Sequence, residues 1–138
     1  MKKTVTWILI ADGAQARVLE NTGPGKGFTQ VENLAFTMEN LRASDVDSNN
    51  GGSTETSQNP VEQRETDFVK NVAEVLEKER QKGAFERLVI AAAPVALGDL
   101  RKAISPHVKK LVIAEVNKDL TNLPTAQLGE HLDGIIAV

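Results

Sequence analysis

The stretch Phe85-Glu86-Arg87-Leu88-Val89-Ile90-Ala91-Ala92-Ala93, followed directly by Pro94, decides the fold. Its centre is a continuous apolar run with β-branched members and no polar alternation, which is typical of a strand covered on both faces. A charged pair leads into the run, and a helical pattern follows it. The stretch therefore predicts the central strand of an α/β sheet.

Three strands are expected before this one. Residues 4–11 alternate, with Val5, Trp7, Leu9 and Ala11 on one face and Ile8 and Ile10 on the other. Asp12-Gly13 is a favoured dipeptide for a tight hairpin turn in which the glycine takes a positive φ. Residues 14–20 then return antiparallel, and residues 28–36 complete a meander.

Helices and strands alternate in the second half of the chain. Pro60 suits the first position of a helix that ends near Lys82, and Gly83 suits its C-terminal cap. A second helix spans residues 97–104, a basic connector 107–110, a strand 111–116, and a last helix starts at Pro124. The order β-β-β-α-β-α-β-α predicts a single domain over residues 1–138, with a mixed sheet like that of ribonuclease-H-like and related translation-component domains.

Composition is that of a globular protein. Of the 138 residues 41% are hydrophobic and 25% charged, and the net charge of -3 argues against a general grip on nucleic acid. The chain has no cysteine, which fits a cytoplasmic protein and excludes thiol chemistry. The apolar run at residues 7–11 is shorter than a signal peptide requires, and no stretch approaches the roughly 20 apolar residues of a membrane span.

Two further features bear on function. Residues 38–58 form a long polar segment without periodicity, and its composition favours a flexible loop. Asp12 and Asp119 fall near strand ends and Glu115 lies in the last strand, so a two-metal nuclease is one alternative. Turn formation explains Asp12 and Asp119 better, and we therefore predict neither a metal nor another cofactor.

Four segments resemble the bacterial host-attachment protein family: Trp7 to Arg17, Gly83 to Pro94, Leu97 to Arg101 and Glu115 to Pro124. The resemblance covers nearly the whole chain outside residues 38–58. The residues that carry it as a family signature are Asp12, Gly13, Arg17, Arg101, Lys118, Asp119 and Thr121. Asp119 and Thr121 are also suited to capping backbone groups ahead of the last helix.

The family is similar to the middle domain of archaeo-eukaryotic peptide-chain release factors. Those factors carry a Gly-Gly-Gln loop that enters the ribosome. The resemblance implies that Gly51-Gly52-Ser53 lies in the corresponding loop of this chain. Ser53 replaces the glutamine and offers no amide, so we expect binding without robust catalysis and name no catalytic residue. Arg42, Gly51, Gly52 and Ser53 are the candidate binding residues.

The expected function is a cytoplasmic domain that engages the translation machinery, with the ribosome or a tRNA-like ligand as partner and no membrane. The first alternative is an interaction protein in host attachment, with a host-cell or protein partner. The second is the metal-dependent nuclease, which requires Asp12 and Asp119 to come within metal-bridging distance.

Overall fold

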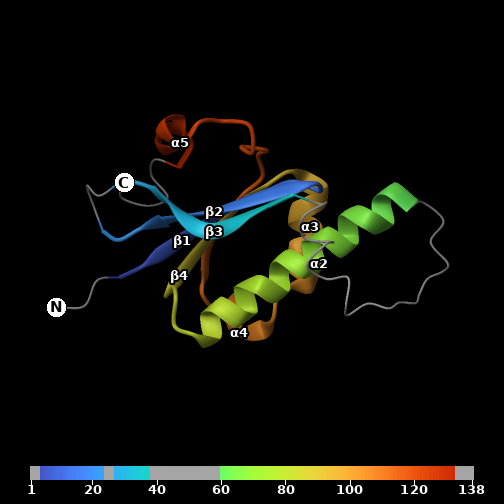
Figure 1. Ribbon diagram of the computed structural model, residues 1–138, viewed down its shortest axis with the longest axis horizontal. Helices are drawn as coiled ribbons and strands as arrows, with labels where there is room; N and C mark the ends of the chain where they lie inside the picture. The colour runs from blue at the N-terminus through green and yellow to red at the C-terminus, as the bar shows by residue number, and fades with distance from the viewer. Residues whose placement is uncertain (1–3, 24–26, 38–59, 133–138) are drawn as a thin grey trace.

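The computed structural model describes residues 4–23, 27–37 and 60–132 (Figure 1). Its five strands form one sheet in the order β3-β2-β1-β4-β5. The strands are β1 (Thr6–Ala11), β2 (Gln15–Asn21), β3 (Thr29–Thr37), β4 (Arg87–Ala92) and β5 (Val112–Val116). β1, β2 and β3 pair antiparallel, whereas β4 pairs parallel with both β1 and β5. The predicted mixed α/β sheet is confirmed.

The first strand, and not the 85–93 stretch, takes the middle position of the sheet. β4 lies one place further out, between β1 and β5. Both strands are nevertheless buried on both faces, as the unbroken apolar run predicts. The predicted alternation of the first strand is also confirmed, because Trp7 and Leu9 pack into one core cluster and Ile8 and Ile10 into the other.

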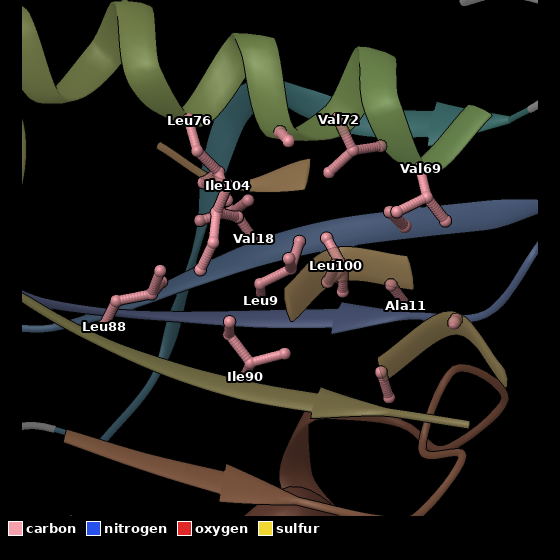
Figure 2. Packing of buried hydrophobic residues seen from close by; sticks show 14 of the residues in the cluster. Leu9, Ala11, Val18, Val69, Val72, Leu76, Leu88, Ile90, Leu100 and Ile104 are labelled. Carbon is pink, nitrogen blue, oxygen red and sulfur yellow. The ribbon is translucent and has the colours of Figure 1, made fainter. Parts of the chain in front are cut away.

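Helices cover the two faces of the sheet unequally. The helices are α2 (Pro60–Gln81), α3 (Pro94–Ala103), α4 (Pro106–Lys109) and α5 (Thr125–Leu132). α2, α3 and α4 lie on one side, and α5 lies on the other (Figure 1). Figure 2 shows Val69, Val72 and Leu76 of α2 pointing down onto the sheet, where they meet Val18 and Leu9. Their spacing places them on one stripe of the helix, which the sheet removes from water.

The predicted basic connector at residues 107–110 is wrong, because its first part is the short helix α4. Ser105 caps this helix by accepting a hydrogen bond from the Val108 backbone nitrogen at 3.0 Å, and Pro106 occupies the first turn. Val108 is fully buried in the larger core cluster. Val108 is the one apolar residue among basic neighbours, so the sequence shows no helical periodicity there.

Gly83 ends α2 as predicted. It has a φ of 77°, and its nitrogen donates to the Arg80 carbonyl while the Ala84 nitrogen donates to the Glu79 carbonyl. These two bonds form the Schellman pattern, which satisfies carbonyls that the helix leaves without partners. The 38–58 loop, with Arg42, Gly51, Gly52 and Ser53, lies outside the described residues.

Candidate functional site

Strand direction brings several signature residues to one edge of the sheet. β1, β3, β4 and β5 all run the same way, so their carboxyl ends share an edge. Asp12 and Gly13 follow β1 at this edge, and Arg17 lies opposite Ile10 on β2. The segment after β5 returns Asp119 and Thr121 to the same place. We call these five residues, Asp12, Gly13, Arg17, Asp119 and Thr121, the carboxyl-edge cluster.

Asp12 organises the turn between β1 and β2. Its Oδ1 accepts hydrogen bonds from the backbone nitrogens of Ala14 and Gln15, both at 2.8 Å, and its own nitrogen donates to the Gln15 carbonyl at 2.9 Å. An aspartate that bonds the backbone two and three residues ahead stabilises a tight turn without help from other segments. This agrees with the turn role that the sequence favours for Asp12.

Thr121 joins the two aspartates of the cluster. Its hydroxyl lies 3.2 Å from Asp12 Oδ2, across 109 residues of chain, and 2.5 Å from Asp119 Oδ1. A hydroxyl carries one proton and so donates to one carboxylate at a time. The Thr121 backbone nitrogen also donates to Asp119 Oδ1 at 3.0 Å, which confirms the predicted capping role of Asp119. Thr121 itself bonds side chains, where the sequence suggested backbone groups.

Gly13 has a steric role that the hairpin prediction did not include. The prediction that Gly13 takes a positive φ is wrong, because the described glycines with positive φ are Gly23, Gly27 and Gly83. A Cβ atom at Gly13 would instead lie 2.8 Å from Cδ and 2.9 Å from Cγ of Glu65 on α2. The missing side chain therefore lets α2 approach the β1–β2 turn. Sequence gave no signal for Glu65, because this contact joins segments that are distant in the chain.

Arg17 is the cation of the cluster. Its Nη2 donates to the Leu123 carbonyl, which ties β2 to the segment before α5. Its Nε is buried and has no hydrogen-bond partner within the described ranges. Arg17 and Thr121 line a pocket of about 340 Å³ that also contacts Gln15 and Ala35.

Two signature residues stand apart from the pocket. Arg101 of α3 donates from Nε and Nη2 to Glu115 Oε1 on β5, at 2.9 and 2.7 Å, and these bonds raise the pKa of the guanidinium. Lys118 is exposed in the turn after β5. The ion pair thus engages Glu115, the third carboxylate of the nuclease alternative. Across residues 4–23, 27–37 and 60–132, no three acidic or histidine side chains form a group able to hold a metal ion.

None of the helices in the described part of the chain is long and apolar enough to cross a membrane.

Comparison with solved structures finds two archaeal proteins that share this fold. The crystal structure of the archaeal translation termination factor aRF1 aligns with a TM-score of 0.51 and 14% identity, covering 92% of this chain and 37% of the factor. A second structure, described only as an archaeal protein, aligns with a TM-score of 0.51 and 17% identity, covering 97% and 34% of the two chains. The chain spans about a third of the length of either one. At such identities the likeness establishes the fold alone.

Sequence comparison gives a family. The model of the family described as "Protein required for attachment to host cells" matches residues 7–132. No curated protein matches the chain at a significant level. The matched range contains all seven residues of the predicted signature.

Proposed function

The chain belongs to the family described as proteins required for attachment to host cells, and from this premise we propose that it is a cytoplasmic binding domain that engages the translation machinery. Its partner in this proposal is the ribosome or a tRNA-like ligand, and it acts without robust catalysis. The observation that carries the proposal is the fold, which this chain shares over 92% of its length with part of an archaeal translation termination factor.

The position of the 38–58 segment supports a role in contacting a partner. β3 ends at Thr37 and α2 begins at Pro60, so both ends of the intervening segment emerge at the carboxyl edge of the sheet. The first buried residue described on α2 is Phe68, whereas Arg64 and Asp67 are exposed. At about 1.5 Å per residue, Phe68 lies some 12 Å along the helix from Pro60.

Within that segment we assign the contact to Arg42, Gly51, Gly52 and Ser53. Arg42 supplies a cation for phosphate or carbonyl oxygens, and paired glycines allow a backbone to approach a ligand closely. Ser53 offers a hydroxyl but no amide, so the segment probes a site without placing a hydrolytic water as a release-factor glutamine does. Binding without peptide release follows from this difference.

The test is sucrose-gradient sedimentation of the tagged protein from growing cells. We compare the wild type with a deletion of residues 42–58 and with an equal-length replacement in which Arg42, Gly51, Gly52 and Ser53 are all changed to alanine. The replacement preserves the connection between β3 and α2, and thermal unfolding verifies that each variant folds. We expect the wild type in the ribosomal fractions and both variants near the top of the gradient. Wild-type protein that remains at the top, or a replacement that sediments with ribosomes as the wild type does, would contradict the proposal.

The family description favours a second function, in attachment to host cells. This alternative requires exposure at the cell surface. Protease treatment of intact cells separates the two, because a surface protein is degraded under conditions that leave a cytoplasmic marker intact. Protection of the tagged chain favours the translation proposal, whereas its degradation together with absence from ribosomal fractions favours attachment.

A further inference from the structure

The pocket beside Arg17 combines one cation with an apolar floor. Ile10, Arg17 and Ala35 occupy paired positions on the three adjacent strands β1, β2 and β3, so their side chains share the face that α5 covers. Gln15 and Thr121 add polar atoms at the rim. The volume of about 340 Å³ falls at the lower end of the range for small-molecule sites, roughly 300–1,000 Å³.

The hydrogen bonding of Arg17 is incomplete. A guanidinium carries five N–H donors, and the described contacts of Arg17 consist of the single bond from Nη2 to the Leu123 carbonyl. Arg80 and Arg101, by comparison, each pair with a glutamate. No carboxylate in the described ranges pairs with Arg17 in this way. A buried Nε without an acceptor is costly, so the side chain is poised to accept an anionic partner.

We propose that this pocket binds a small organic monocarboxylate, with the carboxylate held by Arg17 and the apolar body of the ligand against the exposed Ala35. The planar fork of a guanidinium matches a carboxylate through two parallel N–H···O bonds. Arg17 is partly exposed, so solvent and ligand reach it through the open side of the pocket. The inference uses described residues alone and does not rest on the proposed function.

Charge around the pocket selects a monoanion over a phosphate dianion. Thr121, which lines the pocket, is within hydrogen-bond distance of both Asp12 and Asp119. Each unit of negative charge on a ligand is repelled by these two carboxylates, so a dianion meets about twice the repulsion that a monoanion meets. The one positive charge of Arg17 matches the single negative charge of a carboxylate better than the two negative charges of a phosphate dianion.

The test is an NMR titration of the full chain with three probes of similar shape: benzoate, neutral benzamide and dianionic phenyl phosphate. Benzoate is expected to shift the Arg17 Nε–H signal and the Gln15 and Thr121 amide signals saturably. Benzamide is expected to leave them in place, and phenyl phosphate to bind more weakly than benzoate. An unmoved Arg17 signal with benzoate overturns the inference, as does equal binding of benzamide or tighter binding of phenyl phosphate.

Two variants and one control localise the effect. Arg17→Gln is expected to abolish the saturable shifts, and Arg17→Lys, which retains the charge but not the fork, to weaken benzoate by about tenfold. Arg101→Gln removes an arginine outside the pocket and is expected to bind benzoate as the wild type does. Retained affinity in Arg17→Gln, or equal loss in Arg101→Gln, would show that benzoate responds to overall charge and would overturn the assignment. The comparison of benzoate with benzamide uses wild-type protein and so stands even if a variant fails to fold.

Discussion

Gly13 illustrates how one residue is fixed by a partner far away in the chain. A methyl group there would meet Glu65 Cβ at 3.1 Å in addition to the closer Cγ and Cδ atoms. Gly13→Ala is therefore expected to destabilise the protein by about 1–3 kcal/mol, because the Glu65 side chain must leave its position against the turn. Equilibrium denaturation with urea measures the change.

Two controls accompany Gly13→Ala, one at Glu65 and one at Gly98. Glu65→Ala removes the Cγ and Cδ atoms, so Gly13→Ala is expected to cost less in that background, which a double-mutant cycle reports. Gly98→Ala places the same methyl group on α3, where no atom lies within 4 Å, and is expected to stabilise by about 0.5–1 kcal/mol. Equal effects of Gly13→Ala with and without Glu65 would refute the steric explanation.

Single residues of the site were predictable from sequence, but their partners were not. The Asp-Gly dipeptide and the Lys-Asp-Leu-Thr turn identify Asp12, Asp119 and Thr121 through local backbone chemistry. The bond between Thr121 and Asp12 depends on a register across the whole sheet, which no local pattern encodes. For the same reason the sequence marked Arg17 without indicating its pocket.

At the scale of elements, long periodic patterns were reliable and short ones were not. The strand alternation of Trp7 to Ala11 and the stripe of α2 each repeat often enough to fix which face is buried. α4 contains one buried residue, Val108, within a basic sequence. The helix forms with Ser105 as its N-cap, and the periodic pattern alone does not predict it. β1 lies in the middle of the sheet because it pairs with β4. The order of elements along the chain does not determine which strand pairs with β4.

The junction of α2 with α4 yields a pH prediction. Glu77 accepts hydrogen bonds from Arg80, from the Ser105 hydroxyl at 2.6 Å and from Gln81, and these lower the pKa of its carboxyl from 4.5 to about 2. An unfolded chain then binds a proton at Glu77 before the folded chain does. The stabilising effect is complete above about pH 4.5 and is lost as the pH falls towards 2.

Glu77→Gln tests this junction. The gap in thermal midpoint between the wild type and Glu77→Gln is expected to be widest near neutral pH and to narrow between pH 4.5 and 2, as followed by circular dichroism. Glu74→Gln, at an exposed site on the same helix, serves as the control and is expected to lack this change. A gap for Glu77→Gln that stays constant down to pH 2 would show that the carboxyl gains nothing from the junction.

At the scale of the whole molecule, one sheet separates two cores of unequal size. The larger lies under α2, α3 and α4 and contains Trp7, whose ring stacks on Phe85 at 4.7 Å. The smaller lies under α5 and includes Ile8, Ile10 and Leu128. β1 contributes alternate residues to both, so loss of either core loosens the strand that supports the other. We therefore expect a single cooperative unfolding transition.

Leu128→Ala tests that coupling from the side of the smaller core. Leu128 is fully buried, and its truncation is expected to cost about 2–5 kcal/mol. Trp7 is the single tryptophan of the chain and reports from the opposite face. In Leu128→Ala the urea midpoint reported by Trp7 fluorescence should fall together with the midpoint reported by far-ultraviolet circular dichroism. The control Gln127→Ala, exposed on the same helix, should change the free energy of unfolding by no more than about 0.5 kcal/mol with either probe. If α5 instead detaches alone, the dichroism signal of Leu128→Ala will decline first and Trp7 will unfold at the wild-type midpoint, because the larger core then holds the sheet without it.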